Sequence, residues 1–206
     1  MVNQSNYTGE EDKHEMIELG DVEILAMSAY VSMLRGINVG GQKKIRMDTL
    51  RGIYEELGFT KVRTYVQSGN VVFASTEQNP SDLVKQIEAR IEQACGYPVP
   101  VFIRQSHDLK KILTDNPFLN GRNENPIHLH VTFLYRPPPE TAWSRLATPG
   151  NTSDEFYRGE MAIYLYCPNG YGKTKLSNSF FERKLGSPTT TRNWNTVNAL
   201  YSMVMV

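Results

Sequence analysis

The fold is decided by the stretch Lys61-Val62-Arg63-Thr64-Tyr65-Val66-Gln67-Ser68-Gly69-Asn70-Val71-Val72-Phe73-Ala74. Both of its ends are rich in β-branched and aromatic residues, which favour strands. Between the ends lies Gln67-Ser68-Gly69, where the glycine can supply the positive backbone angle of a tight turn. The pattern therefore predicts two strands, at 61–66 and 70–74, joined as an antiparallel hairpin.

The segments on either side of this hairpin complete a split βαβ unit. Residues 29–34 predict a strand, and apolar residues at helical spacing over 47–57 predict a helix. After the hairpin, a second helix is expected to begin at Ser81, a good amino-terminal cap, and a further strand follows at 99–104. The order strand, helix, strand, strand, helix, strand is typical of a ferredoxin-like subdomain.

The second half of the chain repeats this order more loosely. Its last segment, residues 192–203, predicts a helix where the first half has a strand, so we expect an imperfect repeat. The predicted fold is α+β, with two ferredoxin-like subdomains at 27–105 and 106–206, antiparallel sheets, and helices on the outer faces. The expected elements of the second half are a helix at 106–114, a strand at 128–135, a short helix at 137–146, a hairpin of 155–157 and 161–167, and a helix at 175–185.

Composition and length indicate a soluble globular protein. The chain has 206 residues, of which 40% are hydrophobic, enough to bury a core. Its apolar runs are shorter than the roughly 20 residues that cross a bilayer, and its first residues lack the pattern of a secretory signal. We therefore expect a cytoplasmic protein without membrane contact, in which Cys95 and Cys167 are reduced and partly buried.

Charge is distributed unevenly along the chain. Residues 1–26 contain seven acidic residues and one basic residue, and we expect this extension to be disordered and dispensable. Residues 27–206 carry 21 basic and 15 acidic residues, a net charge of +6. A basic body suggests a polyanionic partner, or an acidic arm that folds back over a basic face.

A glycine-rich basic loop follows the first expected strand. Its glycines, at 36, 40 and 41, do not have the G-x-G-x-x-G spacing, and the next strand pair is antiparallel, so a dinucleotide-binding fold is not expected. Two interpretations stay open. The loop binds an anion, or it is a strand-to-helix connection in which glycines permit turns and Asn38 bonds to backbone groups. The basic residues around it are Arg35, Lys43, Lys44 and Arg46.

The segment 170–174 imitates the end of a phosphate-binding P-loop. The full pattern would need glycine at position 167, where the chain has Cys167, so nucleotide hydrolysis is not expected. A weaker hypothesis is that Lys173, Lys175 and Ser177 bind phosphate at a helix amino terminus without hydrolysing it.

Two further polar clusters have both a structural and a functional interpretation. Thr64, Gln67, Ser68 and Asn70 surround the first hairpin, where polar side chains often stabilise turns. The stretch 189–196 includes Arg192 and Asn193 and precedes a helix, so it can cap that helix or contact a base or phosphate.

Two histidines are candidate metal ligands. His128 and His130 lie two positions apart on an expected strand and therefore point to the same face. This spacing can hold a metal ion. No third ligand lies nearby in the sequence. We therefore expect ordinary sheet residues and no metal site.

With these features in place, the chain resembles the bacterial proteins grouped as domain of unknown function family 1697. The resemblance rests on residues 30–41, 62–73 and 191–197, and it covers the chain from about Met27 to the carboxyl terminus. It implies paired ferredoxin-like subdomains. It implies no reaction, cofactor or ligand, so no catalytic residue is carried over.

Three functional hypotheses follow. The favoured one is a binding module for a phosphorylated or nucleic-acid ligand. The alternatives are an enzyme that acts on a small anionic metabolite between the subdomains, and a homodimeric scaffold that pairs through a free sheet edge. The residues expected to bind the ligand are Arg35, Gly36, Asn38, Gly40, Gly41, Lys43, Thr64, Gln67, Ser68, Asn70, Lys173, Arg192 and Asn193.

Overall fold

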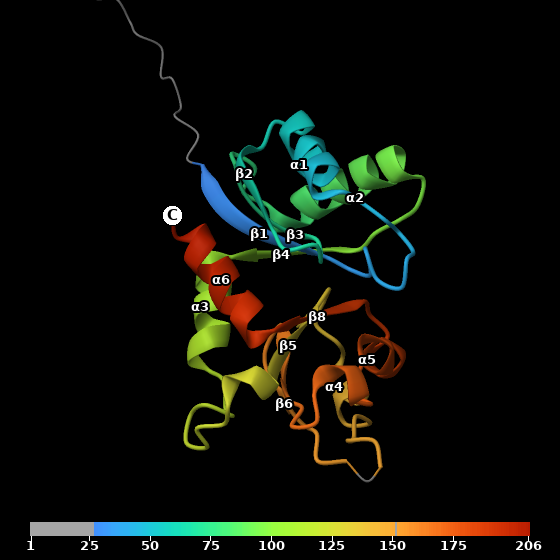
Figure 1. The fold of residues 1–206 in the computed structure, drawn as a ribbon, viewed down its shortest axis with the longest axis vertical. Helices are drawn as coiled ribbons and strands as arrows, with labels where there is room; N and C mark the ends of the chain where they lie inside the picture. The colour runs from blue at the N-terminus through green and yellow to red at the C-terminus, as the bar shows by residue number, and fades with distance from the viewer. Residues whose placement is uncertain (1–26, 151) are drawn as a thin grey trace, which may run out of the picture.

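The computed structural model describes residues 27–150 and 152–206, so the expectations for the acidic extension lie outside the described residues. The described residues form two four-stranded antiparallel sheets (Figure 1). The strand order is β2-β3-β1-β4 in the first sheet and β6-β7-β5-β8 in the second. This arrangement confirms the α+β fold with two similar ferredoxin-like subdomains.

Each half contains strand, helix, strand, strand, helix, strand and helix in that order. The first half consists of β1 (Ser28–Leu34), α1 (Met47–Glu56), β2 (Thr60–Tyr65), β3 (Asn70–Ser75), α2 (Pro80–Cys95), β4 (Val101–Gln105) and α3 (Ser106–Thr114). The second consists of β5 (Leu129–Leu134), α4 (Glu140–Trp143), β6 (Glu155–Arg158), β7 (Ala162–Tyr166), α5 (Asn178–Leu185), β8 (Thr189–Asn193) and α6 (Trp194–Val204). Two 3-10 turns, η1 (Pro126–His128) and η2 (Tyr171–Lys173), lie before β5 and after β7.

The first hairpin forms as the sequence predicts. β2 and β3 pair antiparallel, and Gly69 in the turn between them has a φ of 74°. A side chain at Gly69 would bring a Cβ to 2.8 Å from Leu34 Cβ and 2.7 Å from Ile37 Cδ1. The glycine is therefore required both for its backbone angle and for the close approach of the β1 end.

The start of the last helix differs from the prediction. Residues 189–193 form β8, which pairs with β5, and α6 begins only at Trp194. The threonines at 189–191 favour a strand because they are β-branched, and Asn193 stops it by capping the helix. The second half therefore has its fourth strand, and the repeat is more complete than the sequence pattern suggests.

Three other boundaries shift. The cap of α2 is Asn79, whose side chain accepts a hydrogen bond from the Ser81 backbone, and Pro80 occupies the first turn. The helix expected from residue 175 begins at Asn178, and the strand expected from residue 128 begins at Leu129.

Two cores lie on the outer faces of the sheets, where the predicted outer helices are found. α1 and α2 cover the first sheet, with Tyr54 and Phe73 fully buried between helix and sheet. α4 and α5 cover the second sheet over Ile163 and Phe181.

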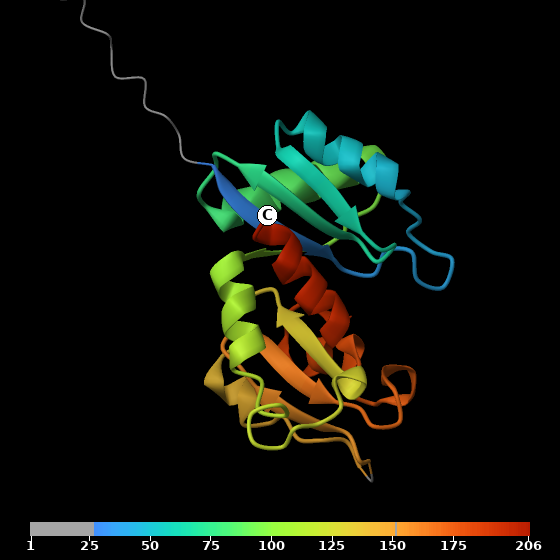
Figure 2. The same ribbon diagram turned by 60° about the vertical axis from the view of Figure 1, so that its left-hand side comes forward.

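A third core joins the two sheets through α3 and α6, which lie side by side between them (Figure 2). Val31 from the first sheet, Val131 from the second and Leu200 from α6 are all fully buried in it. Side chains alternate along a strand, so Tyr30 enters the outer core while Val31 enters this inner one. The two halves therefore share one apolar layer.

No helix within residues 27–150 or 152–206 combines the length and apolar character that a membrane crossing requires.

The shared layer predicts that the halves unfold together. Replacing the buried Leu200 by alanine leaves a cavity between the sheets and is expected to lower the free energy of unfolding by about 2–5 kcal/mol. Urea denaturation followed by circular dichroism and by tryptophan fluorescence should give one coincident transition. Met205→Ala, at an exposed position, should leave stability unchanged, and separate transitions in the Leu200 variant would contradict the expectation.

Candidate functional site at the junction of the two halves

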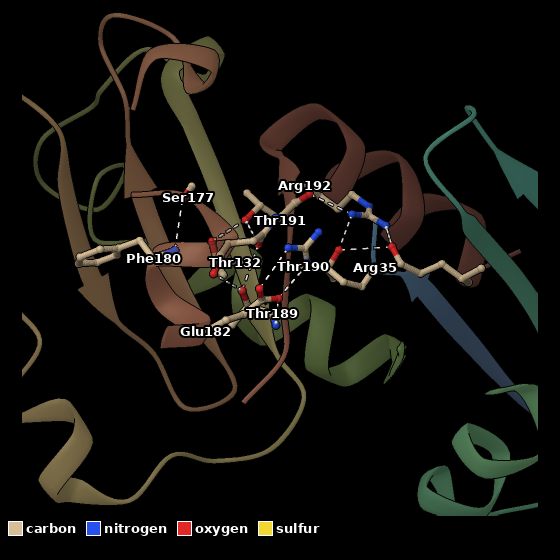
Figure 3. A network of polar contacts seen from close by, with 11 residues as sticks. Arg35, Thr132, Ser177, Phe180, Glu182, Thr189, Thr190, Thr191 and Arg192 are labelled. Carbon is tan, nitrogen blue, oxygen red and sulfur yellow. Dashed lines mark hydrogen bonds and ion pairs between the residues drawn. The ribbon is translucent and has the colours of Figure 1, made fainter. Parts of the chain in front are cut away.

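A buried arginine of the second half binds the first half. Arg192 lies on β8 and is only 8% exposed. Its five N–H groups are all used in hydrogen bonds, several of which are drawn in Figure 3. The acceptors are Asn70 Oδ1 at 2.5 Å from Nε, Thr190 Oγ1 and Thr191 O at 2.8 and 3.0 Å from Nη1, and Leu34 O and Ser68 O at 2.9 and 3.0 Å from Nη2.

These bonds give Arg192 a structural role. Its acceptors are carbonyl, amide and hydroxyl oxygens, so among the described residues no carboxylate neutralises its charge. Burial, and then the nearby charge of Arg35, lowers the pKa of Arg192 to about 10, which leaves it charged at neutral pH. A guanidinium whose donors are all satisfied has none left for a ligand.

The three stretches that carry the family resemblance meet in this network. Leu34 comes from residues 30–41, Ser68 and Asn70 come from residues 62–73, and Arg192 comes from residues 191–197. Two of the predicted ligand contacts, Ser68 and Asn70, therefore accept hydrogen bonds from a third, Arg192.

A second arginine makes the reciprocal contact. Arg104 lies on β4 of the first half and is 7% exposed. Its Nη2 donates to Leu134 O at 2.7 Å and to Met161 O at 3.1 Å, both in the second half. Burial lowers the pKa of Arg104 to about 10. Each half thus inserts a buried arginine against the end of the central strand of the other.

Two glutamates on the outer helices also connect the two halves. Glu182 on α5 accepts from Arg35 Nε at 2.8 Å, and the same oxygen accepts from the Thr189 backbone at 3.1 Å. Glu88 on α2 accepts from the Tyr135 hydroxyl at 3.1 Å and from the backbone N–H of Val101 at 2.8 Å. Arg35 and Tyr135 both directly follow a central strand, so each contact holds one half to the other.

A groove of about 680 Å³ opens beside Arg35 at this junction. The loop after β1 forms one wall through Gly36 and Lys43, and the loop between α5 and β8 forms the other through Ser187 and Pro188. The side chains of Arg35 and Glu182 are 26% and 28% exposed, so their ion pair is open to the groove.

Ser187 contributes a polar group without a partner. The residue is 4% exposed, and its hydroxyl has no hydrogen bond within the described residues. A buried hydroxyl without a partner costs free energy that a ligand atom can recover. Since Ser187 lines the groove, it is a candidate contact for a bound molecule.

The groove has basic surroundings. Lys43 Nζ bonds to Pro98 O at 2.8 Å, and Lys44 follows it directly. Arg183 and Lys184 follow Glu182 on α5, and Arg136 donates to Gly186 O. Among the described residues that line the groove, Glu182 carries the only carboxylate, and Arg35 already pairs with it.

The glycine-rich loop is largely explained by turn chemistry. Gly40 and Gly41 have φ values of 59° and 78°, and Gln42 N donates to Val39 O at 3.2 Å, as in a type I′ turn. Asn38 exchanges two hydrogen bonds with the Ile45 backbone and donates to Gln67 O. These bonds account for Asn38, Gly40 and Gly41 without a ligand, whereas Arg35, Gly36 and Lys43 face the groove.

The remaining predicted contacts lie apart from the groove lining. Thr64 pairs opposite Val71 in the first sheet, and the Gln67 carbonyl accepts from Asn38. The Asn193 side chain caps α6 by accepting from Thr196 N at 2.8 Å. Each has a structural role where it lies.

The P-loop-like segment does not open an α-helix. Lys173 ends the short η2 turn and is exposed, and α5 starts only after Ser177. The Ser177 hydroxyl accepts from Phe180 N at 3.3 Å, so it already serves as the helix cap.

Only one of the two histidines lies on the predicted strand, because His128 ends η1 and His130 belongs to β5. His130 Nδ1 lies 3.3 Å from His128 O. The His130 ring stacks on the Tyr171 ring, with 4.8 Å between the ring centroids. Burial lowers the pKa of His130. Within the described residues, no group of three or more His, Cys, Asp or Glu side chains is placed to share a metal ion.

Sequence reasoning missed one wall of the groove. Glu182 and Ser187 belong to no local motif, and they reach the site only because the two halves pack together.

The Arg192 network predicts a measurable cost for losing Asn70. Asn70→Ala removes the acceptor of Nε and leaves a buried donor unsatisfied, which should lower the free energy of unfolding by about 1–3 kcal/mol. Denaturant titration of the variant measures this difference. Asn195→Ala, at an exposed position on α6, serves as control, and equal stability of the two variants would refute the role of Asn70.

The cysteines are expected to differ in reactivity. Cys167 is fully buried, and burial raises the pKa of its thiol to about 11, whereas Cys95 is partly exposed. Only thiolate reacts readily, so a thiol reagent at pH 8 should modify Cys95 in the folded protein and Cys167 only after unfolding. Mass spectrometry of the labelled peptides would show the order, and rapid labelling of Cys167 would contradict it.

A solved structure has a fold similar to that of this chain. The solved structure of the conserved bacterial protein SP0830 from Streptococcus pneumoniae is similar, with a TM-score of 0.69 and 24% sequence identity. The match covers 87% of this chain and 99% of that one. A comparison with curated proteins finds no match.

A protein-family model matches more than half of the chain. The model of a protein of unknown function, DUF1697, matches residues 27–164, which is more than half of the chain. Its match includes the loop after β1 and the first hairpin, two of the three stretches that meet at the junction. The chain therefore belongs to the DUF1697 family.

Proposed function

We propose that this protein is a binding module for a phosphorylated ligand of about nucleotide size, held in the groove beside Arg35. The observation that carries the proposal is the combination of a partly exposed arginine, a lysine and a buried serine whose hydroxyl has no partner among the described residues, all lining one groove. Guanidinium, ammonium and hydroxyl groups are the donors that phosphate oxygens accept from.

The local charge supports an anionic ligand. Arg35, Lys43, Lys44, Arg183 and Lys184 lie in or next to the two loops that form the groove, and they outnumber the acidic residues there. An excess of positive charge around a groove raises the local concentration of negatively charged ligands. Lys43 reaches a backbone carbonyl in this structure, and the ligand would offer it a charged acceptor instead.

The volume of the groove and the helices that cover both sheets favour a small ligand over RNA. The groove volume of about 680 Å³ falls in the range of roughly 300–1,000 Å³ that is usual for small-molecule sites. RNA-binding domains of this fold stack bases on an open sheet face. Here helices pack on both faces of both sheets. The enzyme and homodimer hypotheses stay predictions.

The test is calorimetric titration of the full chain with pyrophosphate, a nucleoside triphosphate and a single-stranded oligonucleotide. Lys43→Gln should weaken binding of the phosphate compound roughly ten- to hundredfold, because a charge-assisted hydrogen bond contributes about 1.5–3 kcal/mol. Ser187→Ala should weaken it less. Lys110→Gln, an exposed lysine on α3 outside the groove, is the matched control.

The salt dependence separates the outcomes. Affinity for a phosphorylated ligand should fall as salt rises, and Lys43→Gln should reduce that dependence. Preference for the oligonucleotide would assign the groove to nucleic acid. Absence of binding by all three probes, or equal effects of the Lys43 and Lys110 variants, would refute the proposal.

A further inference from the structure

The two halves are related residue by residue across the junction. Arg104 lies opposite Val31 in the first sheet, as Arg192 lies opposite Val131 in the second. Leu34 N donates to Gly69 O, as Leu134 N donates to Met161 O. Each arginine then donates to the carbonyl of the leucine in the other half.

One position breaks this correspondence. Asn70 lies opposite Met33 and accepts from Arg192 Nε, whereas the corresponding residue opposite Phe133 is Ala162. Alanine has no acceptor to offer. Arg104 Nε accordingly has no hydrogen-bond partner among the described residues, although the side chain is more than nine-tenths buried.

A cavity of about 460 Å³ lies beside Ala162, the position at which the acceptor is missing. Ala162 lines it together with Arg104, as do Met161 and Gly159 from the turn between β6 and β7. In the first half the Asn70 amide occupies the equivalent place against the guanidinium. The second half therefore combines an unsatisfied buried donor with open space beside it.

The charges around this cavity are balanced, unlike those of the groove. Arg104, Lys111 and Arg158 line it on the basic side, and Asp108, Asp115 and Glu160 on the acidic side. Lys111 Nζ lies 3.7 Å from Asp115 Oδ2 and 3.9 Å from Glu160 Oε2. The side chains of both acidic residues are at least half exposed. Ile112 and Met161 add apolar wall. A molecule that carries both charges and a short apolar part matches such a lining.

We propose that this cavity binds a small zwitterion, a free α-amino acid. Its carboxylate accepts from Arg104 Nε in the place that Asn70 takes against Arg192, and its ammonium group faces Asp115 and Glu160. The proposal is independent of the phosphate groove, because none of these residues lines the groove.

The first experiment is a thermal-shift screen of the full chain against the L-amino acids, followed by calorimetry of those that raise the melting temperature. The methyl ester and the N-acetyl derivative of each binding amino acid should bind at least tenfold more weakly, since each lacks one of the two charges. If no free amino acid shifts the melting temperature, or if both derivatives bind as well as the parent, the proposal is wrong.

The sharpest variant is Ala162→Asn, which supplies the acceptor that the first half already has. It should abolish amino-acid binding while the melting temperature of the free protein is kept or raised, because Arg104 Nε gains a partner. Undiminished binding by Ala162→Asn would overturn the proposal. Lys110→Gln, outside the cavity lining, should bind like the parent protein.

A second variant keeps the test decisive if Ala162→Asn fails to fold. The double change Asp115→Asn and Glu160→Gln, at exposed carboxylates, removes the charges that face the ammonium group. The double variant should bind the amino acid at least tenfold more weakly than the parent protein does. Its affinity for the N-acetyl derivative should be nearly unchanged. Equal affinity of this variant and the parent protein for the amino acid would contradict the assigned orientation.

Discussion

The reciprocal burial of two arginines at the ends of the central strands is the constraint on which the junction depends. A buried guanidinium is costly unless its donors are satisfied, and here the satisfying carbonyls belong to the opposite half. Separation of the halves would leave those donors and carbonyls without partners. The relative placement of the two sheets is therefore fixed, and the loops after β1 and before β8 are held together as the walls of a groove.

The glutamates on the outer helices extend this constraint through each subdomain. Glu88 and Glu182 each bind the first backbone N–H of the neighbouring edge strand and a side chain from the other half. A shift of either outer helix would disturb the junction. The inner helices α3 and α6 add an apolar layer between the same two sheets, so polar and apolar contacts define one arrangement.

Much of the fold could be predicted from the sequence because it rests on local patterns. Two runs of β-branched and aromatic residues separated by Gly69 identify the first hairpin, and helical spacing identifies α1. The strand at 189–193 was missed because its threonines lie next to the start of a helix and were interpreted as possible caps of that helix. The polar motifs were also visible, but whether Arg192 binds a ligand or Leu34 O depends on contacts between distant segments. Glu182 and Ser187 could not be found for the same reason.

The joining of both halves in one chain has a consequence for how such a protein can specialise. Two identical subunits would carry the same residue at both equivalent positions, so their two junction sites would be alike. A single chain is free of that symmetry, and its linkage keeps the halves at high effective concentration. Asn70 can then lock one arginine into the scaffold while Ala162 leaves the other with a donor to spare, so one architecture yields two chemically different sites.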